Sequence, residues 1–207
     1  IMNNIPVPID FSDASYNAAN YAASLSNAFS ADLILVHAYM NPLAIDQMTP
    51  ALLLQAGIEL QKEKEKLLNE YVEILRKKYT VKIKGVVIES MAASGIQEVA
   101  KNENADVIVM GMKGKGKSNS LFGSNTITVM RKSSIPVLVI PEKAGFKNIE
   151  VITLASDFDA ETEMSNYTLL KKIAQKNDAF IQILNVRKDE STLSPDEISG
   201  KLNTALA

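Results

Sequence analysis

The sequence predicts an α/β fold with a five-stranded parallel sheet and helices on both faces. Short apolar runs without polar alternation recur through the first 140 residues, which is typical of parallel strands covered on both faces. Segments with an apolar or small residue at every third or fourth position separate these runs and indicate helices. Strands that alternate with helices in this way predict a parallel sheet with right-handed crossovers.

The first strand, helix and second strand are predicted within residues 5–38. Residues 5–9 form a short apolar run containing Pro6 and Pro8, and prolines are tolerated in a strand at an edge or entry point. Ser12 is a good N-cap for the helix that follows. A parallel strand is predicted over residues 33–38. One face of the helix is lined by small and apolar residues, namely Ala14, Ala18, Ala22 and Leu25.

The next segments continue the alternation of helices and strands. After an irregular connection over residues 41–50, a long helix is predicted to about Tyr79, with Glu73 and Lys77 spaced as an i,i+4 pair on its charged face. Its apolar face consists of Leu60, Leu67, Leu68, Val72 and Leu75. Further strands are predicted over residues 81–88, 107–110 and 136–141, with helices around residues 96–100 and over residues 124–131.

From residue 149 the pattern starts again. Residues 151–155 precede Asp157 as residues 6–9 precede Asp10, at an offset of 147. A strand is predicted over residues 180–186, and its Asn185 corresponds to His37 at an offset of 148. We interpret this as a tandem repeat, with domains at residues 1–144 and 149–207. The 59 residues of the second copy are too few for a five-stranded sheet. The chain is therefore expected to be a fragment, to be completed by residues outside it, or to fold its short second copy onto the first.

Composition excludes several classes of function. The net charge of −2 gives no positive field for nucleic acid or an anionic membrane. The absence of cysteine excludes disulfides, thiol nucleophiles and cysteine-bound metals. His37 is the single histidine, so multi-histidine metal sites are excluded, and it is expected to be structural at its strand end. No secretory signal pattern is present, which predicts a cytoplasmic protein.

The predicted fold directs attention to one edge of the sheet. Ligands of open parallel sheets bind beyond the carboxyl ends of the strands. Asp10 after the first strand, Ala38 after the second and the glycine-rich segment from Gly111 after the fourth would meet at that edge.

The segment from Gly111 allows two interpretations. Residues 111–118 match the P-loop pattern G-x-x-x-x-G-K-[ST], in which Lys117 would reach phosphates and Ser118 would hold Mg²⁺. Gly123 would, however, break the helix that such a loop requires, and the following strand offers no acidic residue for the metal. Alternatively Gly111 and Gly114 permit a tight turn, and Gly123–Ser124 begins a helix whose N-terminus is an anion site.

These motifs together resemble the universal stress protein family. The resemblance is carried by residues 7–12 (VPIDFS), 35–38 (LVHA), 109–114 (VMGMKG), 123–126 (GSNT) and 135–141 (IPVLVIP). It implies a five-stranded parallel α/β sandwich, a homodimer or an intramolecular tandem pairing that imitates it, and binding of ATP or another adenine nucleotide, with Mg²⁺ as a companion ion. The family pattern G-x-x-G, nine residues, G-[ST] is one residue shorter here, and Ser90-Met91-Ala92 replaces a Gly-x-Pro-like turn.

The resemblance also implies the residues of the site. Asp10 would contact the ribose, the Pro8–Ile9 backbone and Ala38 would flank the adenine, and the glycine-rich segment would hold the phosphates. The residues expected in that last group are Met110, Gly111, Met112, Gly114, Gly123, Ser124, Asn125 and Thr126. We therefore expect a stress-response protein whose bound nucleotide controls its interactions, without a dedicated catalytic reaction beyond slow ATP turnover. A nucleotide-independent dimeric interaction module and a P-loop enzyme remain the alternatives.

Overall fold

The computed structural model describes residues 2–41, 49–112, 123–155 and 167–184, together with residues 194, 196 and 200. The chain forms two compact units, residues 2–146 and a second unit that starts at Lys147. Each unit is described by itself. The described part contains no helix that is both long and apolar enough to cross a membrane.

The first unit has the predicted α/β class, but its strands form two ladders. Strands β1, β2 and β3 pair in that order, all parallel, and β4 pairs in parallel with β5. Strand β1 lies beside β4 without a ladder between them. A single hydrogen-bonded sheet of five strands was expected, so that expectation is corrected. The strands are β1 (Asn4–Pro8), β2 (Asp32–Tyr39), β3 (Ile83–Glu89), β4 (Ile108–Gly111) and β5 (Val137–Ile140).

The prolines of β1 explain the division. Ile9 donates its N–H to β2 (2.8 Å), whereas the Asn4 carbonyl accepts from Asp106 at the β4 side (3.1 Å). Alternate residues of a strand present their backbone groups to opposite neighbours, so Pro6 and Pro8 face β4. Because proline has no N–H, the bonds that these residues would donate to β4 cannot form. The prediction that the prolines mark an edge strand is thus confirmed within the three-stranded ladder.

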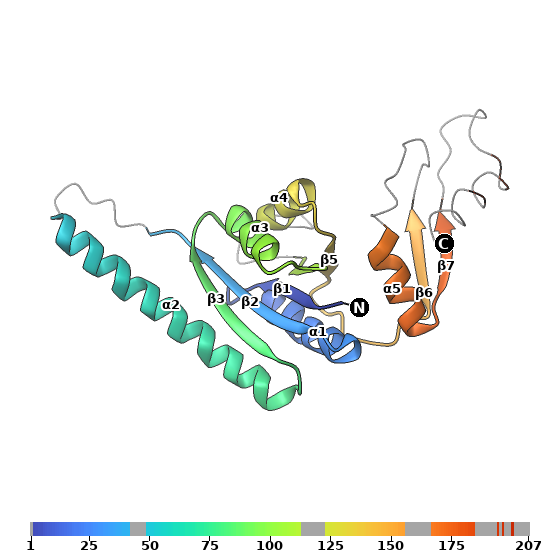
Figure 1. The fold of residues 1–207 in the computed structure, drawn as a ribbon, viewed down its shortest axis with the longest axis horizontal. Helices are drawn as coiled ribbons and strands as arrows, with labels where there is room; N and C mark the ends of the chain where they lie inside the picture. Colours follow the sequence, from blue (N-terminus) through green and yellow to red (C-terminus); the bar gives the residue numbers. More distant parts are fainter. Residues whose placement is uncertain are drawn as a thin grey trace. The chain divides into compact units, whose positions relative to one another are not determined.

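Among the described residues of this unit, four helices cover the strands on two faces. Helix α1 packs on β1, β2, β4 and β5, and α2 packs on β2 and β3, while α3 contacts β1, β2, β3 and α4. Figure 1 shows α3 and α4 on one side of β1 and β2, with α1 on the other. Ser12 caps α1 with a capping box, as its sequence position predicts. The helices are α1 (Asp13–Phe29), α2 (Pro50–Lys78), α3 (Ala92–Asn102) and α4 (Ser124–Lys132).

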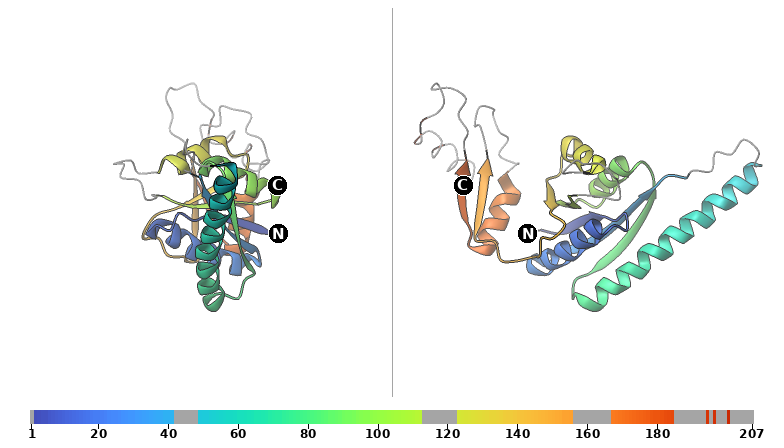
Figure 2. Two further views of the ribbon diagram at one scale, coloured as in Figure 1. Left: turned by 90° about the vertical axis from the view of Figure 1, so that its left-hand side faces the viewer. Right: turned by 180° about the vertical axis from the view of Figure 1, so that it is seen from behind.

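Helix α2 is held to the unit through its C-terminal half. Its buried residues are Leu68, Val72 and Leu75, and its first turns extend past the strands in Figure 1 and in the right-hand view of Figure 2. Leu67 is 40% exposed, so its expected place on the apolar face is wrong. Glu73 forms its ion pair with Arg76 (2.6 Å) rather than with Lys77, which corrects the predicted spacing.

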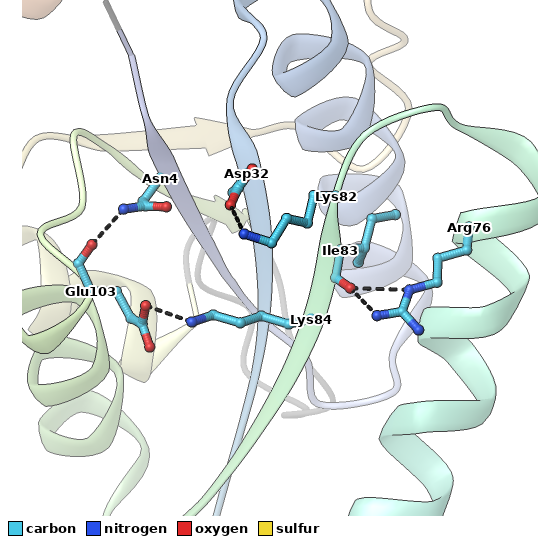
Figure 3. A network of polar contacts seen from close by, with 7 residues as sticks. All are labelled: Asn4, Asp32, Arg76, Lys82, Ile83, Lys84 and Glu103. Carbon is cyan, nitrogen blue, oxygen red and sulfur yellow. Dashed lines mark hydrogen bonds and ion pairs between the residues drawn. The ribbon is translucent and has the colours of Figure 1, made fainter.

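Polar contacts join the elements at the amino ends of β1, β2 and β3 (Figure 3). Lys82 pairs with Asp32 (2.8 Å) and Lys84 with Glu103 (2.6 Å). The hydrogen bond to the Asp32 carboxylate raises the pKa of Lys82 above its ordinary value. The carbonyl of Glu103 also accepts from the side chain of Asn4. These contacts lie at the end opposite the candidate site.

The second unit contains β6 (Val151–Ala155), α5 (Thr168–Asn177) and β7 (Phe180–Leu184), and its two strands are parallel. Its local geometry repeats that of β1–α1–β2. Helices α1 and α5 each end at a left-handed residue, Ser30 with φ 57° and Asp178 with φ 53°. The next residue, Ala31 or Ala179, donates its N–H to the helix at 2.9 Å in both units.

Candidate functional site

The turn between β1 and α1 presents Asp10 at the carboxyl end of the strands. The Asp10 carboxylate accepts hydrogen bonds from the Ser12 N–H (3.0 Å) and from the Ser12 hydroxyl (2.5 Å). Asp10 is exposed, so the carboxylate is oriented by the turn and still meets solvent. An oriented, exposed carboxylate can accept hydrogen bonds from the hydroxyl groups of a ligand.

His37 fixes this turn to β2. Its Nδ1 lies 2.7 Å from the Ile9 carbonyl oxygen, and because a carbonyl only accepts, Nδ1 carries the proton. The ring of Phe11 lies against the imidazole, with centroids 4.8 Å apart. Phe11 has a φ of 58°, which is unfavourable for a residue with a side chain. The predicted structural role of His37 at its strand end is confirmed.

Gly111 brings the end of β4 against the start of α1. A Cβ added at Gly111 would lie 2.7 Å from the carbonyl oxygen of Ala14, closer than van der Waals contact permits. The glycine is therefore required by the packing of a strand on a helix. The sequence alone indicated a turn here, and the close approach to α1 could not be inferred from spacing.

Hydrogen bonds close the base of the glycine-rich segment. Met112 donates its N–H to Ile140 of β5 (2.9 Å), and its carbonyl accepts from the N–H of Gly123 (3.0 Å). Thr126 donates its hydroxyl to the Gly111 carbonyl (3.1 Å). Residues 112 and 123 are thus held together. The candidates between them, Gly114, Lys117 and Ser118, lie outside the described residues.

Helix α4 begins next to this base. Gly123 is its N-cap and has no side chain to satisfy the first N–H groups, and Ser124 and Asn125 are exposed. The N-terminus of a helix favours anions through its N–H groups and its dipole. This start at Ser124 agrees with the second interpretation of the segment. Thr126 is buried and its hydroxyl is engaged with Gly111, so it holds the base of the segment.

Several expected site residues can contribute through their backbone. The side chains of Ile9 and Met110 are buried, and Met110 packs in the core with residues of α3 and α4. The methyl group of Ala38 lies beside α3, 3.3 Å from the position of a Cβ built on Gly95. Pro8 is half-buried at the end of β1. Adenine recognition at these positions would therefore use the backbone groups of the strand ends.

The contacts place the carboxyl ends of β1, β2 and β4 and the start of α4 at one edge. The connections are His37 with Ile9, Ala14 with Gly111, and Met112 with Gly123. Sequence reasoning missed the contacts of Phe11 and Thr126, although the Asp10-x-Ser12 spacing is a signal for the turn itself. Among the described residues, no group of three His, Cys, Asp or Glu side chains could hold a metal ion.

Residues 2–141 match the model of the universal stress protein family. Universal stress protein MJ0531 of Methanocaldococcus jannaschii is 31% identical over 147 residues, covering 68% of this chain and 82% of that protein. A crystal structure of a universal stress protein from Archaeoglobus fulgidus has a similar fold, with a TM-score of 0.71 and 18% identity, over 99% of this chain and 74% of its own. A universal stress protein in complex with cAMP has a TM-score of 0.51 and 23% identity, over 67% and 97% of the two chains.

Proposed function

Because this chain belongs to the universal stress protein family, we propose that it is a stress-response protein that binds an adenine nucleotide, such as ATP or AMP, at the carboxyl edge of β1, β2 and β4. The observation that carries this proposal is the linked set of contacts between the Asp10 turn, the end of β4 and the start of α4. A universal stress protein of similar fold is known in complex with cAMP, which supports a nucleotide as the ligand class.

Each part of the edge has a chemical role in this proposal. The Asp10 carboxylate accepts from the ribose hydroxyls, and the backbone of Pro8, Ile9 and Ala38 borders the adenine. The phosphates lie at the start of α4, where Gly123 leaves the first N–H groups without a side-chain cap. The residues proposed to bind the phosphates are Gly111, Met112, Gly114, Gly123, Ser124 and Asn125. Met110 and Thr126 support these residues from the core.

A Mg²⁺ ion bound with the nucleotide would be held chiefly by phosphate oxygens. Magnesium binds through few carboxylates together with substrate phosphates, and the described residues contain no ready acidic cluster. We propose no dedicated catalytic reaction. The bound nucleotide instead changes the surface that partners contact at this edge. We place this activity in the cytoplasm.

The test begins with the purified full chain. Ligand is released by denaturation and identified by mass spectrometry, and the stripped protein is titrated with ATP by calorimetry. We expect saturable binding that weakens about tenfold in Asp10→Ala, the loss of one charge-assisted hydrogen bond. Asp13→Ala is the matched control, because Asp13 is an exposed carboxylate in the first turn of α1. Equal affinity of the Asp10→Ala variant would contradict the proposed ribose contact.

Two variants distinguish the alternatives. Gly123→Val should abolish binding at the start of α4, whereas Lys117→Ala should leave it nearly unchanged. A strict requirement for Mg²⁺ and loss of activity in Lys117→Ala would instead favour the P-loop enzyme. If the purified protein carries no ligand and gives no heat with millimolar ATP, the nucleotide-independent interaction module is favoured.

We also propose that residues 1–144 and 149–207 are tandem copies of one domain type, with the second incomplete in this sequence. The matching strand pairing and helix ends support this interpretation. Limited trypsin digestion should cut first at Lys143 or Lys147 and leave an intact N-terminal fragment. Light scattering then separates a homodimer, with twice the chain mass, from an intramolecular pairing. Early cleavage throughout residues 2–141 would contradict the domain assignment.

A further inference from the structure

We propose that His37 is a positioning residue for the nucleotide site and that it acts by holding the two sequence neighbours of Asp10. This inference rests on the proposed function, because it assigns His37 to the ribose contact of that site. His37 is not expected to touch the reacting or binding groups of the nucleotide itself.

Ile9 is attached to β2 through both its N–H and its carbonyl group. Its N–H donates to the Val36 carbonyl (2.8 Å), and its own carbonyl accepts from Nδ1 of His37 (2.7 Å). The ladder between β1 and β2 ends at the pair Pro8–Val36. The side chain of His37 therefore continues the attachment of β1 to β2 for one residue beyond the ladder.

His37 also supports Phe11. This residue has a φ of 58°, a left-handed conformation that the surrounding structure must maintain. The Phe11 ring contacts the imidazole of His37 at 4.8 Å with the planes tilted by 52°. One imidazole thus holds Ile9 through a hydrogen bond and Phe11 through ring packing, on either side of Asp10.

His37 is itself held in the central strand of the three-stranded ladder. His37 pairs through its backbone with Val87 of β3, inside a three-stranded ladder. Asp10 is exposed, and its carboxylate is directed by Ser12. A binding group keeps its orientation when residues on rigid elements support it. Loss of His37 should therefore free the Asp10 turn while the sheet stays folded.

The inference predicts a selective defect. In His37→Phe, which keeps a ring and loses the Nδ1 donor, ATP should bind about tenfold more weakly. Inorganic tripolyphosphate, which has no ribose, should bind within about twofold of wild type, because the start of α4 is not altered. His37→Asn offers an amide nitrogen near the position of Nδ1 and should restore ATP affinity to within about threefold.

A double-mutant cycle with Asp10→Ala separates positioning from general loss of structure. In the Asp10→Ala background, His37→Phe should weaken ATP binding less than twofold. The control is Val87→Ala, which alters the β3 partner of His37 and leaves the side chains around Asp10 intact; its ATP affinity should stay near wild type. Equal weakening of ATP and tripolyphosphate, or a full tenfold effect without Asp10, would overturn the inference.

A readout without nucleotide distinguishes failure of this inference from failure of the proposed function. By nitrogen NMR, the neutral His37 ring should carry its proton on Nδ1. The Ser12 amide, which donates to the Asp10 carboxylate and to the Ser15 hydroxyl oxygen, should exchange with solvent at least tenfold faster in His37→Phe than in wild type. If the protein binds no ATP but shows this change in exchange rate, His37 supports the Asp10 turn and the proposed ligand is wrong. An unchanged exchange rate would overturn the support role.

Discussion

Gly111 packs directly against the backbone of Ala14. A methyl group at Gly111 would lie 2.7 Å from the Ala14 carbonyl oxygen and 2.9 Å from its carbonyl carbon. Neither atom can move without shifting the first turn of α1. The joint between β4 and α1 therefore depends on the absence of a side chain at residue 111.

We expect Gly111→Ala to destabilise the protein by about 2 kcal/mol, as overpacking of a tight interior contact does. Urea unfolding followed by circular dichroism measures this loss. Gly145→Ala is the matched control, since a Cβ at Gly145 meets no atom within 4 Å, and its stability should change by less than about 0.5 kcal/mol. Similar stabilities for the two variants would show that the strand end can withdraw from α1.

Arg76 protects the outer edge of β3. Its Nε and Nη2 donate to the Ile83 carbonyl at 3.1 and 2.5 Å (Figure 3). The Lys82 carbonyl accepts from Leu33 of β2, so the next carbonyl, Ile83, faces away from β2. An unprotected strand edge can pair with another chain.

We expect Arg76→Gln to lower the free energy of unfolding by about 1 kcal/mol and to increase aggregation on warming. Lys77→Gln is the control, because it removes one positive charge from the neighbouring exposed position. Unfolding curves and light scattering on heating measure the two effects. If Lys77→Gln aggregates as much as Arg76→Gln, the effect comes from net charge and not from the strand edge.

Tyr71 makes stability depend on pH above the normal tyrosine range. Its ring packs on Tyr16 of α1, with centroids 4.6 Å apart. Burial, followed by the nearby Tyr16 and Tyr79, raises the pKa of Tyr71 well above its ordinary value. In the unfolded chain Tyr71 loses its proton near pH 10, whereas the folded protein retains it. The contribution of Tyr71 is therefore complete below pH 10 and is lost as the pH rises above it.

We expect the stability of wild type relative to Tyr71→Phe to fall between pH 10 and pH 11. The fall should be at most about 1.4 kcal/mol per pH unit, reduced by screening because the ring is partly exposed. Urea unfolding of both proteins at pH 8, 10 and 11 provides the measurement, and ionisation of groups that do not interact with Tyr71 cancels in the difference. A constant difference over this range would show that Tyr71 ionises freely in the folded protein.

The helices and strands could be predicted from the sequence because the patterns that indicate them are local. Ser12 is the N-cap of α1 and Gly123 is the N-cap of α4. The apolar runs without alternating polar residues coincide with strands. The sequence was also sufficient to place Asp10 and Gly111 at the same edge, because parallel strands share their carboxyl ends. The contacts that give these residues their geometry join distant positions, such as Ile9 with His37 and Ala14 with Gly111. No local pattern encodes such pairs.

The ladders illustrate the same limit. Pro6 and Pro8 indicated an edge, but the neighbour that loses its hydrogen bonds is β4, about a hundred residues later in the chain. Leu67 is exposed although its neighbour Leu68 is fully buried, so its exposure depends on how α2 is rotated about its axis against β2 and β3, which its periodicity does not specify. The place of a residue within a helix or strand can be predicted from the sequence. The residues that it contacts depend on how the helices and strands pack together.

The described part of the second unit exposes apolar side chains on one face of its ladder. Phe180 is 78% exposed, and Val151 and Leu184 are about half exposed. In the first unit the strand that corresponds to β7 is β2, whose Ile34 and Val36 pack against Val99 of α3. The register places Leu184 at the position of Val36, because each pairs with the last residue of its partner strand. The same type of strand face is therefore covered in one unit and exposed in the other.

We expect this face to bind the hydrophobic dye ANS. Phe180→Ser should lower the dye fluorescence at least twofold. The stability of the protein should change little, because an exposed ring contributes little to the folded core. Leu54→Ser is the control, because Leu54 is a similarly exposed apolar residue on α2, at 68%. A loss of fluorescence specific to Phe180 identifies the β6–β7 face as an apolar surface that binds the dye. Equal losses in both variants would mean that the dye binds exposed side chains without preference for that face.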